Sequence, residues 1–291
     1  MAKIIMSILS NLDEYKRWRD NKLANANTKI ETCLIEISNP FELTRSEKDR
    51  VRLLCQQNNF ALFNIEQQDN YPQAIFAINK QLGLVGYDPH LYVQDQGLAH
   101  ITQSVKKDQA EFIPYTDKAI GWHTDGYYNT IEQRIRAFSL FCVTPANRGG
   151  ENQWIDQQMV YLQLRESNPD IAKALTHTQA MSIPEHVVNG VVRRKTSIGA
   201  IFFIDEPSSQ LYMRYTQRKK NIEFLDAQEV KQAITILDVH LSTTTEYHFS
   251  HIMTANQGIL CNNILHKRSE FIDNPLNPRL LLRGRYFNRL N

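Results

Sequence analysis

Short apolar or alternating runs recur along most of this 291-residue chain, separated by Pro, Gly, Asn, Asp or Ser. Such runs are typical of β-strands. The longest, IRAFSLFCVTP at residues 135–145, is almost continuously apolar and predicts a central strand buried on both faces. Further strands are predicted at residues 33–37, 61–65, 151–155, 179–183, 187–194, 200–204, 211–215, 247–253, 258–262 and 278–287.

Helical periodicity is confined to a few segments, and polar residues begin most of them. Ser46 and Asp156 are the expected N-caps of two helices, because their side chains can accept a hydrogen bond from the first turn. The polar segment 86–116 is expected to be irregular. Helices are predicted over residues 10–25, 46–59, 72–83, 156–167 and 226–241.

This order of elements favours a mainly β fold with peripheral helices. Many short strands with few helices are typical of a double-stranded β-helix, or jelly roll, and not of a parallel α/β sheet. No internal repeat or linker-like Gly/Ser stretch divides the chain. We therefore expect a single domain over residues 1–291, in which the elements of 1–115 pack on a jelly-roll core formed by 116–291.

Composition narrows the choice of partners and compartment. The 33 Lys and Arg residues nearly balance 31 Asp and Glu residues, which argues against nucleic acid or an anionic membrane as the main partner. No apolar stretch has the length of a membrane span, and no secretory signal is evident. The four cysteines are scattered, without a C-x-x-C pair, which favours a reducing compartment. We expect a soluble cytoplasmic protein that acts on a small molecule, and homo-oligomerisation is left open.

The candidate chemistry begins in the sequence GWHTDGYYN. His123 and Asp125 are two residues apart, so on an extended segment both side chains point the same way and can bind one ion. His266 lies far downstream, at the end of an apolar strand. Two imidazoles and one carboxylate can hold one face of a ferrous ion and leave the other face open to substrate-derived ligands and dioxygen. The simpler alternatives are a surface His–Asp hydrogen bond and an ordinary buried histidine.

The neighbours of His266 strengthen its candidacy over another histidine pair. Asn262 and Asn263 precede it, and amide side chains of this kind can orient a metal ligand. His248 and His251 have a spacing that suits metal binding on a helix. Their segment is strand-like, where they would face opposite sides, so a structural role is favoured for that pair.

Three arginines share one face of the last predicted strand. Alternation places Arg279, Arg283 and Arg285 together, where their charges repel each other unless anionic groups meet them. Arginine binds carboxylates in a bidentate manner, which suits an oxo-diacid and an acidic substrate. The alternative is an edge strand whose solvated arginines pair with surface acids such as Glu270 or Asp273.

The combined motifs resemble the taurine dioxygenase/TfdA-like family of Fe(II)- and 2-oxoglutarate-dependent dioxygenases. The resemblance spans roughly residues 115–287 and rests on GWHTDGYYN, FSLFCVTPANRGGENQWID, NNILHKRSEF and PRLLLRGRYF. It implies a jelly roll in which His123, Asp125 and His266 bind Fe(II). It also implies oxidation of a C–H bond of a small organic substrate by O2, with release of succinate and CO2. Halogenating relatives lack the carboxylate, so Asp125 favours hydroxylation or a related oxidation.

The resemblance also implies how the cosubstrate and substrate are bound. Arg279 would pair with the distal carboxylate of 2-oxoglutarate, and Arg283 would contact the cosubstrate or an anionic substrate. The family has Thr where this chain has Asn152, whose amide can still donate a hydrogen bond. The residues expected to contact substrate are Tyr127, Tyr128, Asn129 and Arg285.

Two other functions remain open at this point. A metal-dependent hydrolase or lyase could use the same triad around zinc or manganese, although Arg279 would then have no role. A non-catalytic jelly-roll protein could bind a ligand there. Arg193 and Arg194 could reach the pocket from a loop, but an exposed charge pair is the simpler interpretation. No residue identifies the primary substrate.

Overall fold

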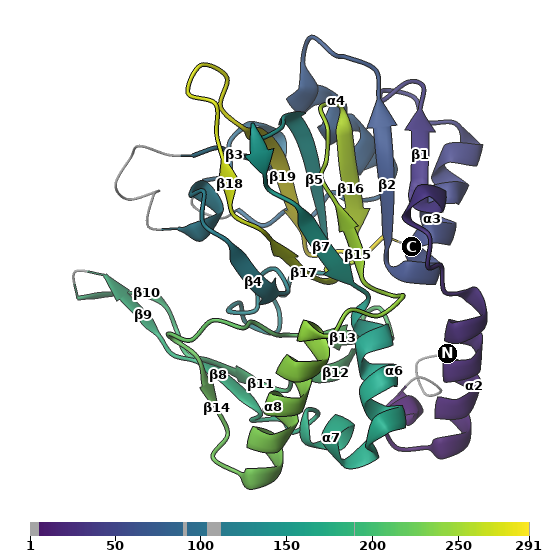
Figure 1. The fold of residues 1–291 in the computed structure, drawn as a ribbon, viewed down its shortest axis with the longest axis vertical. Coiled ribbons are helices and arrows are strands. Elements are labelled where there is room, and N and C mark those ends of the chain that lie inside the picture. Colours follow the sequence, from purple (N-terminus) through teal and green to yellow (C-terminus); the bar gives the residue numbers. More distant parts are fainter. Residues whose placement is uncertain (1–5, 90–91, 104–111, 189, 291) are drawn as a thin grey trace.

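Two β-sheets of different size form the upper part of the molecule (Figure 1). The computed structural model describes residues 6–89, 92–103, 112–188 and 190–290. The larger sheet has the strand order β1-β2-β16-β5-β19-β3 and the smaller one the order β15-β7-β17-β4. The larger sheet contains β1 (Leu34–Ile37), β2 (Phe60–Ile65), β3 (Leu98–Ile101), β5 (Ala137–Thr144), β16 (Gln257–Cys261) and β19 (Leu280–Tyr286). The smaller sheet contains β4 (Ile120–His123), β7 (Asn152–Ile155), β15 (Phe249–His251) and β17 (Leu265–Arg268).

Strand β5 is central to the larger sheet, as its apolar run predicts. It pairs antiparallel with β16 on one side and with β19 on the other. Only the outer pair of β1 and β2 is parallel. The mainly β jelly-roll prediction is thus confirmed by the strand order and by the solved structures compared below.

The outer face of the larger sheet is covered by α3 (Arg45–Asn58) and α4 (Tyr71–Gln81). The expected N-cap of α3, Ser46, is wrong. Thr44 caps the helix instead, accepting from the Glu47 amide while the Glu47 carboxylate accepts from Thr44. The helix ends at Asn59, whose φ of 64° is the left-handed conformation common after helices.

The expectation of an irregular segment at 86–116 is also wrong in part. It contains β3, which pairs with β19 so that Ile101 lies opposite Leu281. Strands β1, β2 and β3 all come from the first 115 residues. This part of the chain therefore builds half of the larger sheet, in addition to the helices that pack on it.

The segment between β7 and β15, residues 156–248, is called the insert below, and it forms most of the lower part of Figure 1. It has a largely separate hydrophobic core. As predicted, Asp156 caps its first helix by accepting from the Gln158 amide. Its helices are α6 (Gln157–Ser167), α7 (Pro169–Ala174) and α8 (Gln228–Ser242). Its strands are β8 (Met181–Ile183), β9 (His186–Val188), β10 (Val191–Arg194), β11 (Ser197–Gly199), β12 (Phe202–Asp205), β13 (Gln210–Met213) and β14 (Glu223–Phe224).

The remaining elements are short or lie at the periphery. Helix α2 (Leu12–Asn25) packs on the insert, where the Tyr15 hydroxyl donates to Glu166 at 2.8 Å. None of the helices in the described part of the chain has both the length and the apolar character required to cross a bilayer. The other short elements are β6 (Arg148–Gly149), β18 (Phe271–Ile272) and 3-10 turns at Met6–Leu9, Ile30–Cys33, Asp95–Gly97 and Ile113–Tyr115.

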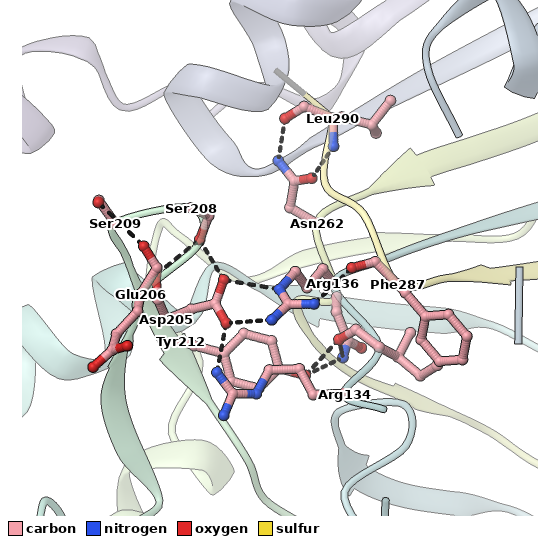
Figure 2. A network of polar contacts seen from close by, with 12 residues as sticks. Arg134, Arg136, Asp205, Glu206, Ser208, Ser209, Tyr212, Asn262, Phe287 and Leu290 are labelled. Carbon is pink, nitrogen blue, oxygen red and sulfur yellow. Dashed lines mark hydrogen bonds and ion pairs between the residues drawn. The ribbon is translucent and has the colours of Figure 1, made fainter. Parts of the chain in front are cut away.

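A buried ion cluster joins the insert to the larger sheet (Figure 2). Asp205, at the end of β12, is 1% exposed and accepts from the guanidinium groups of Arg134 and Arg136, which lie just before β5. Ser208 donates a further hydrogen bond to this carboxylate at 2.7 Å. Arg136 also donates to the Phe287 carbonyl, just beyond β19. One carboxylate therefore fixes the β12–β13 hairpin against the ends of two central strands.

Candidate metal centre and cosubstrate pocket

The structure brings together the three residues proposed as metal ligands. His123, the last residue of β4, lies directly opposite His266 of β17, and their ring centroids are 4.2 Å apart. Asp125 follows two residues after His123, and one ligand atom from each of the three residues lies within 4.8 Å of the others. Among the described residues, this is the one group of three or more such side chains that could share a metal ion.

Backbone carbonyl groups set the orientation of both imidazole rings. Nδ1 of His123 faces the Gly121 carbonyl at 2.9 Å, and Nδ1 of His266 faces the Ile264 carbonyl at 2.9 Å. A carbonyl only accepts, so Nδ1 carries the proton and the Nε2 lone pair is free to bind a metal. Burial lowers the pKa of His123 to about 3, helped by the neighbouring imidazole, and burial also lowers the pKa of His266. Both rings are therefore neutral at pH 7, the form that metals require.

Asp125 supplies a buried negative charge to the same point. Burial by itself would raise the pKa of its carboxyl group, but the guanidinium groups of Arg283 and Arg285 hold that pKa well below its usual range. Oδ1 lies 3.9 Å from Nη1 of Arg283, and buried Oδ2 has no hydrogen-bond partner within the described chain. Buried polar atoms are rarely left unpaired, so this oxygen fits a bound cation.

The Asn263 amide fixes the backbone of Asp125. Its Oδ1 accepts from the Asp125 amide at 2.7 Å, and its Nδ2 donates to the Asp125 carbonyl at 2.9 Å. Nδ2 also donates to the Ile135 carbonyl and to the Tyr212 hydroxyl. Asn262 instead bonds both backbone groups of Leu290, as Figure 2 shows. Amide support was predicted for His266. In the structure, the Asn263 amide supports Asp125 instead.

His248 and His251 make ordinary hydrogen bonds, which agrees with the structural role favoured for this pair. Nδ1 of His248 accepts from the Thr245 amide at 3.0 Å, and Nε2 of His251 lies 2.9 Å from the Gln257 side-chain oxygen.

A cavity of about 720 Å³, which includes space open to solvent at its mouth, lies between the two sheets beside this triad. Its walls are mainly apolar, and the charged side chains come from the triad, from the end of β17 and from residues 279 and 283 at and within β19. The predicted cosubstrate residues Asn152, Arg279 and Arg283 line it. The predicted substrate residues Tyr127, Tyr128, Asn129 and Arg285 do not. The lining residues are Ile101, Pro114, Ile120, His123, Asp125, Phe138, Leu140, Asn152, Trp154, Met253, Ile259, Ile264, His266, Lys267, Arg268, Arg279, Leu281 and Arg283.

Arg279 brings a buried positive charge to this cavity. The side chain is 4% exposed, and its guanidinium lies 4.8 Å above the Phe271 ring. Burial lowers its pKa to about 10, so the group is still charged at pH 7. Within the described residues the guanidinium has neither a carboxylate nor a carbonyl hydrogen-bond partner. The nearby Asp273 carboxylate accepts instead from the backbone amides of Asn274 and Arg279. A buried charge without a partner is costly, which favours an anionic ligand at this position.

The alternative of solvated arginines on an edge strand is wrong. Strand β19 lies between β5 and β3, and both Arg279 and Arg285 are 4% exposed. The strand alternation predicted from sequence is maintained, because Arg279, Leu281 and Arg283 all face the cavity.

Arg268 is a cavity residue that the sequence argument missed. Its guanidinium also lies over the Phe271 ring, 4.9 Å from the ring centroid, and donates to the carbonyls of Thr116 and Lys118. Burial lowers its pKa to about 9. The sequence signal that could have identified Arg268 is its position two residues after His266. In the smaller sheet, Arg268 pairs with Asn152 of β7.

The Gly149-Gly150 turn brings the backbone close to these residues. Gly149 has a φ of 78°, and a side chain there would place Cβ 2.5 Å from the Glu270 carbonyl oxygen. Asn152 follows two residues after Gly150 and donates to its carbonyl at 3.2 Å. Glycine is thus required where the chain passes β18 to place Asn152 on the cavity wall.

The predicted substrate residues lie outside the cavity; Tyr127, Tyr128 and Asn129 follow the proposed metal ligand Asp125 in the chain, and Arg285 comes from β19. The Tyr127 hydroxyl accepts from Arg218 at 3.0 Å, and the Tyr128 hydroxyl accepts from Arg285 at 2.9 Å. Asn129 donates to the Gln133 carbonyl at 2.8 Å. Arg285 is also paired with Asp88.

A jelly roll that presents two neutral imidazoles, one carboxylate and a buried unpaired arginine defines a non-haem iron oxygenase type of site. The profile of the family described as "Taurine catabolism dioxygenase TauD, TfdA family" matches residues 20–285, and the chain belongs to this family. The resemblance read from the motifs is confirmed. The chain is an iron- and 2-oxoglutarate-dependent dioxygenase, and the hydrolase and non-catalytic alternatives are set aside.

Individual relatives agree with this family. A uridine-5'-phosphate dioxygenase from a Streptomyces species is 27% identical over 222 residues, which are 74% of this chain and 78% of the relative. The crystal structure of PvcB from Pseudomonas aeruginosa has a TM-score of 0.60 at 16% identity, covering 88% of this chain and 85% of PvcB. A taurine dioxygenase from Burkholderia xenovorans has a TM-score of 0.58 at 16% identity, with 87% of each chain covered.

Proposed function

We propose that His123, Asp125 and His266 hold the ferrous ion of this dioxygenase. The observation that carries this assignment is the buried, ionised and unpaired oxygen of Asp125 beside two rings whose Nε2 atoms are free. A divalent cation would satisfy all three groups at once. Asn263 would keep the carboxylate in position by holding its backbone on both sides.

We further propose that 2-oxoglutarate extends from the triad to Arg279. The guanidinium would form a bidentate pair with the distal carboxylate and so neutralise a charge that is otherwise buried alone. Arg268 adds positive potential at the same end of the cavity. The Asn152 amide would donate to the cosubstrate, and Arg283 would lie between the cosubstrate and Asp125.

Iron and 2-oxoglutarate, when bound, supply the oxygen activation that yields succinate, CO2 and an oxidised substrate. The protein orients these groups and excludes water through the apolar cavity wall. Asp125 occupies the position that a halide would need, which supports hydroxylation or a related C–H oxidation. No side chain is required as a general base.

For the substrate, we propose a phosphorylated pyrimidine nucleoside such as uridine 5'-phosphate. The relative named for that activity supports this choice, and so does the positive charge around Tyr127 and Tyr128. These two residues, with Asn129 and Arg285, would form the side of the substrate site next to the metal.

Four buried free thiols support a cytoplasmic location.

Succinate formation tests this function. Purified protein with Fe(II), 2-oxoglutarate and O2 should release succinate slowly, and uridine 5'-phosphate should accelerate the release. Asp125→Ala should abolish both rates, because the metal loses its charged ligand. Asp226→Ala is a suitable control, since that aspartate is exposed just before α8 and, among the described residues, forms its ion pair with Lys231. An Asp125→Ala enzyme with the wild-type succinate rate would refute the ligand assignment.

A further inference from the structure

Two arginines from the insert converge on the tyrosine pair that follows the metal ligands. Nη1 of Arg218 donates to the Tyr127 hydroxyl at 3.0 Å. The Arg194 guanidinium lies 5.3 Å from the centroid of the Tyr128 ring. The two rings are in edge-to-face contact, with centroids 5.1 Å apart. The two positive charges are therefore brought together by neighbouring aromatic side chains, although they are far apart in sequence.

Arg194 has no acidic partner in the described chain. Its Nη2 donates to the Pro184 carbonyl at 2.9 Å, and its Nε is buried without a hydrogen bond. The groups that act on its charge are Tyr127, Tyr128 and Arg218, and burial lowers its pKa. Several other arginines of the chain are compensated by an acid: Arg285 by Asp88, and Arg134 and Arg136 by Asp205. A half-buried guanidinium beside a second guanidinium gains stability when an anion binds both.

These charges adjoin the metal centre. Tyr128 follows Asp125 by three residues, and its hydroxyl accepts from Arg285, which itself acts electrostatically on Asp125. Positively charged groups thus follow one another from Arg283 at the triad to Arg285 at the Tyr128 hydroxyl and to Arg194 over the Tyr128 ring. A substrate that reaches from the iron toward the insert would meet Arg194 and Arg218 with its distal end.

An irregularity in the β9–β10 hairpin separates Arg194 from its neighbour. Val192 pairs with Val187 and Arg194 with His186, so Arg193 is the extra residue of a β-bulge. Bulges often re-aim a side chain next to an active site. Arg193 is exposed, whereas Arg194 is partly buried against Tyr128. The sequence interpretation of both residues as an exposed charge pair therefore holds for Arg193 only.

We propose that Arg194 and Arg218 form a clamp for a phosphate monoester on the primary substrate, an inference that rests on the dioxygenase function proposed above. A phosphate dianion matches two guanidinium charges and offers the oxygen geometry that arginine binds in a bidentate manner. The Tyr127 and Tyr128 hydroxyls each accept from an arginine, so each keeps its own proton to donate to a phosphate oxygen. The phosphate clamp would thus determine specificity without taking part in the oxidation.

Binding under anaerobic conditions separates the clamp from catalysis. Uridine 5'-phosphate and uridine are titrated calorimetrically into protein loaded with Fe(II) and 2-oxoglutarate. Wild type should bind the phosphorylated nucleoside at least about tenfold more tightly than uridine. Arg194→Ala and Arg218→Ala should each weaken binding of the phosphorylated nucleoside by roughly 10- to 100-fold, the size expected for a lost charge-assisted hydrogen bond. Both should leave uridine binding unchanged.

Arg193→Ala is the matched control, because it removes an equal charge from the adjacent, exposed position. Arg193→Ala should retain the wild-type preference for uridine 5'-phosphate over uridine. Arg194→Lys should keep part of the preference that Arg194→Ala loses. The clamp is refuted if wild type binds uridine as tightly as uridine 5'-phosphate. It is also refuted if Arg194→Ala and Arg218→Ala keep the preference for uridine 5'-phosphate, or if Arg193→Ala loses as much affinity for uridine 5'-phosphate as they do. The visible band of the iron–2-oxoglutarate complex is recorded in every variant. Its absence in wild type would refute the proposed metal and cosubstrate sites, whereas an intact band without phosphate preference refutes the clamp alone.

Discussion

At the scale of single residues, Asn263 connects the fold to the proposed metal centre. One buried amide holds both backbone groups of Asp125 and also reaches Ile135 and Tyr212. Asn263 has a φ of 48°, a conformation that asparagine and glycine tolerate better than other residues. Sequence alone showed an amide near His266, but not that it serves a carboxylate 138 positions earlier.

Asn263→Gly tests this role, because glycine keeps the positive φ and removes the amide. Loss of the two hydrogen bonds to Asp125 should weaken Fe(II) binding about 10- to 100-fold. It should also lower the free energy of unfolding by about 1–3 kcal/mol, since buried backbone groups lose their partners. Asn262→Ala should lower stability through Leu290 but leave the Kd for Fe(II) unchanged. Equal iron affinities in the two variants would show that Asn263 has only a structural role.

The contacts that the sequence did not show share one physical cause. Arg268 was missed altogether and is held by the Phe271 ring and by carbonyls before β4. Arg194 was considered as a residue that could reach the pocket, but its contact with the Tyr128 ring was not foreseen. Strand alternation shows which residues share a face, as it did for Arg279 and Arg283. It does not show which distant element lies against that face.

At the scale of elements, the Asp205 cluster couples the insert to the strands that carry the site. Arg134 and Arg136 flank Ile135, whose carbonyl accepts from Asn263 and Tyr212. The ion cluster in Figure 2 therefore adjoins Ile135, which accepts from the same Asn263 amide that holds the backbone of Asp125.

This cluster predicts an acid-sensitive contribution to stability. Hydrogen bonds from Arg136, Ser208 and Arg134 outweigh the effect of burial and lower the pKa of Asp205 to about 2. Because its folded pKa lies below its unfolded value, the stabilisation is complete above about pH 4 and is lost as the pH falls toward 2. Asp205→Asn should lower the free energy of unfolding at pH 6 by about 3 kcal/mol.

The difference in free energy of unfolding between wild type and Asp205→Asn should decrease by about 1 kcal/mol between pH 6 and pH 3. Urea denaturation of both proteins at the two pH values measures it. A deficit that stays constant or widens on acidification would contradict the cluster's electrostatic role.

Local sequence also determines how far the elements themselves were predictable. Long apolar or well-capped segments, such as β5 and α6, were located correctly because their signals are local. Strand β3 was missed because four residues, LAHI, carry little periodicity and become a strand by pairing with β19. The cap at Thr44 was displaced because the reciprocal Glu47 contact favours it over Ser46.

At the scale of the whole molecule, the site is assembled from three parts of the chain. The first 115 residues supply half of the larger sheet, the smaller sheet supplies the imidazoles, and the insert would supply Arg194 and Arg218 of the proposed phosphate clamp. The jelly roll and its triad were readable from sequence because motif spacing and strand pattern agree. The place of the insert beside the triad was not readable, since its contacts join residues far apart in the chain.

The central claim is that the triad binds iron and Arg279 binds 2-oxoglutarate in one cavity. Anaerobic titration of the protein with Fe(II) and 2-oxoglutarate, followed through the visible charge-transfer band, measures both at once. The band should appear in wild type, be absent in His266→Ala, and require on the order of 100-fold more 2-oxoglutarate in Arg279→Ala, with iron binding retained. A wild-type protein without the band, or an Arg279→Ala variant with unchanged demand for 2-oxoglutarate, would contradict the account.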